Sequence, residues 1–113
     1  ILIEVNVAEE ETKFGLETGE TEELVRKISV LPHVHIKGLM TIAPFVENAG
    51  NNRMIFRTLK DLSVDIGSKN IDNVSMNILS MGMTNDFETA IEEGATHIRV
   101  GTAIFGERNI AIC

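Results

Sequence analysis

Two segments of this chain pair a glycine with a hydroxyl side chain, a combination that suits the binding of an anion. Ser80 lies two residues before Gly82, and Gly101 directly precedes Thr102. Glycine lets the backbone come close to a ligand, and hydroxyl and free backbone N–H groups donate hydrogen bonds to phosphate. Each segment alone is also typical of an ordinary turn between a strand and a helix. If the two turns follow neighbouring strands, they can hold one phosphate group from two sides.

Arg99 stands just before the second of these turns. Its neighbours Ile98 and Val100 are apolar, so in a strand they face one way and Arg99 faces the other, more polar way. A guanidinium keeps its proton in proteins and needs hydrogen-bond acceptors. Two interpretations remain open: a structural ion pair with Glu4, or a fixed donor to a ligand.

The three histidines do not predict a metal site. His33 and His35 lie close together near a proline, His97 lies far along the chain, and no cysteine or carboxylate pattern completes a set of ligands. We interpret them as loop and strand-edge residues. The single cysteine, Cys113, excludes an internal disulfide, so we expect a cytoplasmic protein.

Composition narrows the class of partner. The chain has 113 residues, with 10 Lys plus Arg against 17 Asp plus Glu, a net charge of −7. An acidic chain without a basic run is not expected to bind nucleic acid or an anionic membrane. No segment approaches the roughly 20 apolar residues of a membrane span. The 43% hydrophobic content is typical of one globular domain.

Hydrophobic periodicity predicts strands alternating with helices. Strands are expected over residues 1–7, 34–42, 76–81 and 97–101, helices over 22–31, 53–66 and 86–93, and a helical turn near 103–105. The predicted helix ends are Thr21 and either Thr84 or Asn85 as N-caps, with Gly67 and Gly94 as stops. Strict alternation predicts an α/β fold with a parallel sheet.

Two architectures fit this order: an open doubly wound sheet, or half of a (β/α)8 TIM-type barrel. A doubly wound sheet has helices on both faces, so both faces of its strands should be apolar. Here each strand has one mixed face, and we expect these faces to be Glu4 and Asn6; Gly38 and Met40; Asn77, Leu79 and Met81; and His97, Arg99 and Gly101. The mixed faces favour the half barrel, whose functional groups lie at the carboxyl ends of the strands. A full barrel takes about 250 residues.

Four segments of the chain resemble motifs of one family. Residues 5–15, 38–45, 79–86 and 98–108 are similar to the fifth to eighth strand motifs of the pyridoxal-phosphate homeostasis proteins, also called proline synthetase co-transcribed homologues. That family is related to the barrel domain of alanine racemase. The resemblance covers nearly the whole chain. It implies that residues 1–113 are the C-terminal half of a single (β/α)8 barrel domain, comprising its last four βα units.

The resemblance also implies a ligand, pyridoxal 5′-phosphate (PLP), and a cytosolic, usually monomeric protein that holds and delivers this cofactor. The implied binding residues are Ser80, Gly82, Gly101 and Thr102 for the phosphate, Arg99 for the pyridine nitrogen, and Met40 and Asn6 for the pocket wall. The implied role is PLP (vitamin B6) homeostasis.

One element of the family pattern is missing. The lysine that holds the cofactor covalently lies at the end of the family's first strand, whereas this chain begins at a segment similar to the fifth. None of the five lysines lies in a motif like that of the family's first strand, so the covalent role is assigned to none of them. They are Lys13, Lys27, Lys37, Lys60 and Lys69. No catalytic residue is therefore predicted within the chain, and the N-terminal half of the barrel is an expected partner.

Three functions remain open: a carrier of PLP, a PLP-dependent enzyme, and a purely structural half barrel. A pyridine nitrogen that faces Arg99 stays unprotonated, which makes the ring a poorer electron acceptor and favours a non-catalytic carrier. The alternative is a PLP-dependent amino-acid racemase or decarboxylase of the same fold, which needs positioned acid and base groups. The chain contains no tyrosine for that task. In a purely structural half barrel, the two edge strands, residues 1–7 and 97–101, would need pairing by the missing half or by a second copy.

Overall fold

Four parallel strands form one sheet, and their order in space is their order in the chain. The computed structural model describes residues 1–8, 15–44, 52–101 and 104. The strands are β1 (Leu2–Glu4), β2 (Ile36–Met40), β3 (Val74–Met83) and β4 (His97–Arg99), in the order β1-β2-β3-β4. All three pairings are parallel, which confirms the predicted α/β class with a parallel sheet.

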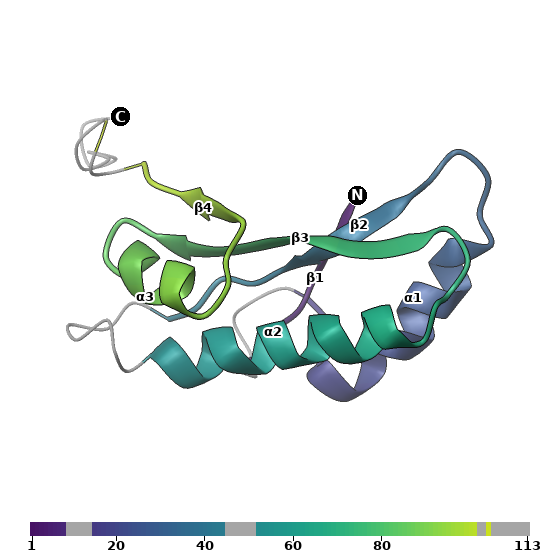
Figure 1. Cartoon of the computed structure of the whole chain (residues 1–113), viewed down its shortest axis with the longest axis horizontal. Coiled ribbons are helices and arrows are strands. Elements are labelled where there is room, and N and C mark those ends of the chain that lie inside the picture. The colour runs from purple at the N-terminus through teal and green to yellow at the C-terminus, as the bar shows by residue number, and fades with distance from the viewer. Residues whose placement is uncertain (9–14, 45–51, 102–103, 105–113) are drawn as a thin grey trace, which may run out of the picture.

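The helices lie together on one face of this sheet (Figure 1). They are the 3-10 turn η1 (Thr18–Glu20) and the α-helices α1 (Thr21–Ser29), α2 (Arg53–Ser68) and α3 (Phe87–Glu92). A doubly wound sheet would carry helices on both faces. Among the described residues, the helices therefore do not have the two-sided arrangement of a doubly wound sheet. No helix among the described residues is long and apolar enough to cross a bilayer.

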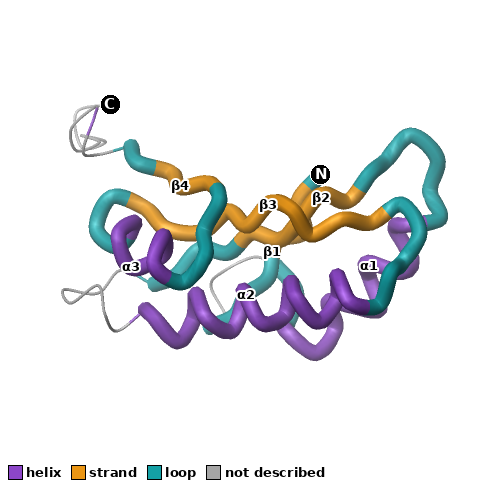
Figure 2. The backbone as a smooth tube through the Cα atoms, in the orientation of Figure 1, coloured by secondary structure: helices purple, strands orange, loops and turns teal. Residues whose placement is uncertain are grey.

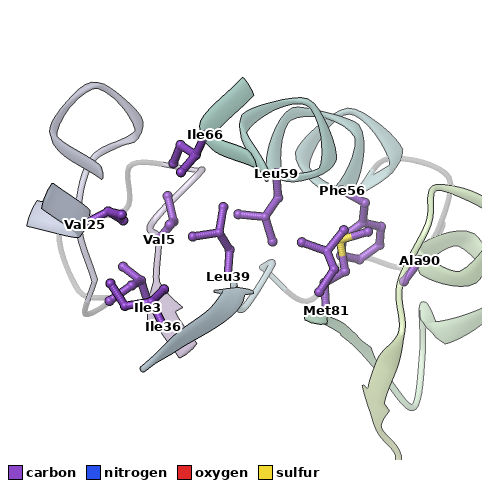
Figure 3. Packing of buried hydrophobic residues seen from close by; sticks show 11 residues of the cluster. Ile3, Val5, Val25, Ile36, Leu39, Phe56, Leu59, Ile66, Met81 and Ala90 are labelled. Atoms are coloured by element: carbon purple, nitrogen blue, oxygen red, sulfur yellow. The ribbon is translucent and has the colours of Figure 1, made fainter. Parts of the chain in front are cut away.

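The hydrophobic core lies between the sheet and the helices (Figure 3). The helices contribute Val25, Phe56, Leu59, Ile66 and Ala90, and the strands and their ends contribute Ile3, Val5, Ile36, Leu39, Leu79 and Met81. Burial of a side chain such as Phe56 or Leu59 contributes about 1.5–3 kcal/mol.

The prediction for the faces of β3 was wrong at two residues. Leu79 and Met81, expected on the mixed face, are 3% and 0% exposed in the core below the helices. Met76, expected on the apolar face, also packs against the core, because the register of β3 against β2 shifts between the Ile36–Val74 and Gly38–Ile78 pairs and strict alternation of the faces does not hold along the strand. Leu79 is in register with Leu39, and through it with Ile3, and packing of this row against the helices decides the face. Ser80 consequently faces away from the helices, in one row with Met40 and Glu4.

Several element ends differ from the predictions. Helix α1 begins at Thr21 itself, whose hydroxyl donates to the Glu17 carbonyl. Helix α2 continues through Gly67 to Ser68. Asp86, rather than Thr84 or Asn85, is the N-cap residue of α3. Gly94 follows α3 with φ +108°, as expected of a C-terminal glycine. The predicted turn near 103–105 lies outside the described residues apart from Ile104.

Gly38 allows β2 and β3 to approach each other. A Cβ at this position would overlap the Ile78 carbonyl oxygen, so the strand pairing requires a residue without a side chain. We expect Gly38→Ala to lower the free energy of unfolding by about 3 kcal/mol or more, because backbone rather than a flexible side chain must move. Gly19→Ala is the matched control, since a Cβ there meets nothing within 4 Å. Urea unfolding of both variants measures the difference, and equal stabilities would contradict this account of the pairing.

Candidate functional site

The carboxyl ends of the parallel strands bring several predicted residues to one edge of the sheet. Met40 pairs with Ser80, Ser80 pairs with His97, and Met83 pairs with Arg99. The short strand β4 thus lies along the carboxyl end of β3 (Figure 2). The two neighbouring strand ends assumed for the anion site are therefore adjacent in space.

Arg99 reaches across this edge toward the end of β2. Its Nη2 donates to the Thr41 carbonyl oxygen at 2.8 Å, although the two residues are 58 positions apart in the chain. Its Nε is buried and has no hydrogen-bond partner among the described residues. None of the ion pairs in the described part of the chain joins Arg99 to Glu4. A buried donor without a partner is rare and costs free energy, so the arrangement suits an acceptor that a ligand would supply.

Ser80 and Gly82 form the exit from β3. Ser80 is 6% exposed, and its carbonyl accepts a hydrogen bond from the Thr41 N–H at 3.1 Å. No hydrogen bond in the described structure engages the Ser80 hydroxyl. Gly82 has φ +101°, and a Cβ there would lie 2.6 Å from the Ala90 Cβ on α3. This end of β3 is therefore packed closely onto α3 and needs glycine for both its conformation and its space.

The structure describes three of the four other predicted site residues, namely Met40, Asn6 and Gly101. Half-buried Met40 ends β2, and half-buried Asn6 follows β1, where its N–H donates to the Leu16 carbonyl at 2.7 Å. Gly101 follows β4, and its carbonyl accepts the Ile104 N–H. Thr102 lies outside the described residues. The structure thus brings Met40, Ser80 and Arg99 together at the carboxyl edge.

Sequence reasoning missed a buried polar pair that supports this edge. The side-chain amide of Asn52 donates to the Pro44 carbonyl and to Asp86 Oδ2, both at 2.9 Å. Asp86 Oδ1 in turn accepts the Met83 N–H at 2.7 Å. Asn52 and Asp86 are almost completely buried. This pair fastens the start of α2, and the segment after β2, to the turn after β3. Each residue precedes a helix, which is the only signal that the sequence offers.

An ion-pair cluster joins α2 to α3. Arg53 contacts Glu92 and Glu93, and Arg57 contacts Glu93. Hydrogen bonds from Arg57 and Arg53 lower the pKa of Glu93 below its ordinary value of 4.5. The same hydrogen bonds to carboxylates raise the pKa of both arginines. The cluster holds α3 against α2 and involves none of the predicted ligand-binding residues.

The histidines are placed as loop and strand residues. His33 adopts a positive φ of 67°, and His97 Nδ1 lies 2.9 Å from its neighbour Thr96 Oγ1. Within the described ranges no three His, Cys, Asp or Glu residues are grouped so that they could hold a metal ion.

The chain is similar to a known family over almost its whole length. The model of the alanine racemase N-terminal domain matches residues 1–109. A "pyridoxal phosphate homeostasis protein" of Aquifex aeolicus is 50% identical over 108 residues, which are 96% of this chain and 46% of that protein. The protein of the same name from Haemophilus influenzae is 38% identical over 109 residues, again 96% of this chain and 46% of that protein. The chain thus spans about half the length of these relatives.

Solved structures are also similar to almost the whole of this chain, which again covers less than half of each of two larger chains. A structure described as that of "an unknown protein" from Bifidobacterium adolescentis matches with a TM-score of 0.85 and 39% identity, over 92% of this chain and 42% of that one. PipY of Synechococcus elongatus, solved with PLP bound, matches with a TM-score of 0.80 and 30% identity, over 93% of this chain and 48% of that one.

Removal of the Asn52 or the Asp86 side chain should destabilise the protein at the carboxyl edge of the sheet. We expect Asn52→Ala and Asp86→Ala each to lower the free energy of unfolding by about 1–3 kcal/mol, because each leaves a buried polar partner unpaired. The double variant should lose clearly less than the sum of the two, with a coupling of about 1 kcal/mol or more. Chemical denaturation of the four proteins measures this, and strict additivity would show that the pair does not act as a unit.

The Glu93 cluster predicts a dependence of stability on pH. Because its pKa is lowered in the folded state, Glu93 stabilises the protein above its ordinary pKa of 4.5, and this contribution is lost as the pH falls through the lower folded value. Glu93→Gln should therefore flatten the acid limb of a plot of melting temperature against pH. Glu88→Gln, on the helix α3 that Glu93 directly follows, is the control. A limb equally steep in wild type and Glu93→Gln would contradict the assignment.

Proposed function

This chain belongs to the alanine racemase N-terminal domain family, and on that premise we propose that it forms the phosphate- and ring-binding part of a PLP-binding protein of vitamin B6 homeostasis. The observation that carries the proposal is the unpartnered Arg99 Nε, buried at the carboxyl edge of the sheet. A pyridine nitrogen is a single acceptor of the kind that this N–H lacks. The names of the curated relatives and the PLP-bound neighbour support the same ligand.

The residues at this edge fit the other parts of the cofactor. The Ser80 hydroxyl and the backbone at Gly82 would hold the phosphate from the end of β3, while Gly101 and Thr102 would hold it from the end of β4. Met40 lies in register with Ser80 and would line the pocket together with Asn6. When bound, PLP supplies an aldehyde that reacts with amines and a ring that accepts electrons.

The role of Arg99 favours a carrier over a catalyst. A guanidinium cannot give up its proton to the ring, so the pyridine nitrogen in front of it stays an unprotonated acceptor. The ring then withdraws electrons less strongly, which suits holding and delivering the cofactor. A racemase or decarboxylase remains the second candidate, because the family model that matches is named for a racemase domain.

We further propose that residues 1–113 form the C-terminal half of a single (β/α)8 barrel. The helices cover one sheet face only, and in the described sheet the two outer strands, β1 and β4, have one neighbour each. A second set of four βα units would pair with both edges, enclose the uncovered face and contribute the lysine that binds PLP covalently. Cytoplasmic location and a monomeric state stay predictions from the sequence.

The Arg99 role predicts a spectroscopic effect. In the full-length product of the gene, we expect Arg99→Ala to weaken PLP binding about tenfold or more, which corresponds to loss of a charge-assisted hydrogen bond of about 1.5–3 kcal/mol. The absorbance band of the bound cofactor should also shift, because the ring nitrogen loses its partner. Titration followed by absorbance measures both, and unchanged affinity and spectrum would reject the role.

The phosphate site predicts selectivity between two vitamers. Ser80→Ala combined with Thr102→Ala should raise the dissociation constant for PLP while leaving that for pyridoxal, which has no phosphate, close to the wild-type value. Isothermal titration with both compounds measures this. Equal losses for the two compounds would show that these hydroxyls do not act on the phosphate.

A further inference from the structure

We infer that Thr41 is the positioning residue that aims the Arg99 guanidinium at the ligand, an inference that rests on the proposed function. Thr41 directly follows β2 and is 1% exposed. Its carbonyl oxygen is the one acceptor that the described structure gives to Arg99. In the sequence it is a polar residue that interrupts the apolar pattern of a strand, within the segment 38–45, and it was not among the predicted binding residues.

Three hydrogen bonds fix the position of Thr41 between all of its neighbouring strands. Its N–H donates to the Ser80 carbonyl of β3 at 3.1 Å. Its hydroxyl donates to the Val5 carbonyl, just beyond β1, at 2.6 Å. Its carbonyl accepts from Arg99 of β4 at 2.8 Å. One residue therefore connects the carboxyl ends of all four strands, including both segments that carry ligand-binding candidates.

The hydroxyl is the part of Thr41 that a substitution can test. The hydroxyl and the N–H hold Thr41 at two points. The direction of the Thr41 carbonyl is therefore fixed by contacts that do not involve Arg99. A guanidinium is planar and rigid, so a bond at Nη2 leaves only a narrow range of directions for Nε. An unanchored arginine would have to give up its rotamer freedom when the ligand binds. Thr41 removes that cost in advance and so raises affinity without touching the ligand.

The test compares Thr41→Val with Thr41→Ser in the full-length product of the gene. Valine keeps the shape and loses the hydroxyl, whereas serine keeps the hydroxyl and loses only a methyl group. We expect Thr41→Val to raise the PLP dissociation constant about fivefold to tenfold and to shift the absorbance band of bound PLP in the direction seen for Arg99→Ala. In Thr41→Ser, the PLP dissociation constant and the absorbance band should both stay near their wild-type values. If Thr41→Val does not fold, Thr41→Ala takes its place in the comparison.

Two controls separate positioning from a general loss of stability. Ser63→Ala removes another buried hydroxyl, which donates to the Lys60 carbonyl within α2, and should lower the melting temperature without changing PLP affinity. In the Arg99→Ala background, Thr41→Val should weaken binding no further, because Thr41 acts through Arg99. Equal additional losses with and without Arg99 would overturn the inference.

A measurement without ligand keeps this test distinct from that of the proposed function. The side-chain Nε–H signal of Arg99 in a ¹⁵N–¹H spectrum should move in Thr41→Val and return in Thr41→Ser. If the wild-type protein binds no PLP, the proposed function fails, whereas the Arg99 signal still reports whether Thr41 positions the side chain. An Arg99 signal that is identical in wild type and Thr41→Val would contradict the inference whether or not PLP binds.

Discussion

The register between β2, β3 and β4 is the constraint on which the candidate site depends. Met40 beside Ser80, and Met83 beside Arg99, place residues from three separate βα units at one edge. The register requires Gly38, because any side chain there would meet the backbone of β3. It also requires the apolar row of Ile3, Leu39 and Leu79 to face the helices, which leaves Glu4, Met40 and Ser80 on the other side. A shift by one residue would exchange the two rows.

Polar contacts then hold the ends of the strands in place. The Asn52–Asp86 pair joins the segments that follow β2 and β3, and Thr41 links β1, β3 and Arg99. Within the described part of the chain, Ser75 Oγ and Arg99 Nε are the buried side-chain polar atoms without a partner. Ser75 lies near the amino end of β3, whereas Arg99 lies at the carboxyl edge of the sheet, where the proposed function places the ligand. The unsatisfied donor therefore has a functional explanation that Ser75 does not share.

The sequence predicted the order and type of the elements because periodicity, glycine and helix caps are local signals. It also placed Ser80 and Arg99 on adjacent strand ends, since strict alternation implies a parallel sheet. It failed for the faces of β3, because the pairing with β2 shifts register between the Ile36–Val74 and Gly38–Ile78 pairs, an irregularity that a rule of strict alternation cannot reveal. It could not find the Asn52–Asp86 pair or the role of Thr41, because these contacts join residues 34 or more positions apart. The resemblance to a family supplied the ligand, which no local pattern specifies.

The proposed function depends on a hydrogen bond that Arg99 donates to an unprotonated pyridine nitrogen. The most direct measurement is the ¹⁵N NMR shift of PLP labelled at the ring nitrogen and bound to the full-length product of the gene. We expect the shift of an unprotonated pyridine near neutral pH. The hydrogen bond should displace it from the shift of free unprotonated PLP, and Arg99→Ala should return it toward that value. A shift typical of a pyridinium, or one that is the same in wild type and Arg99→Ala, would contradict it.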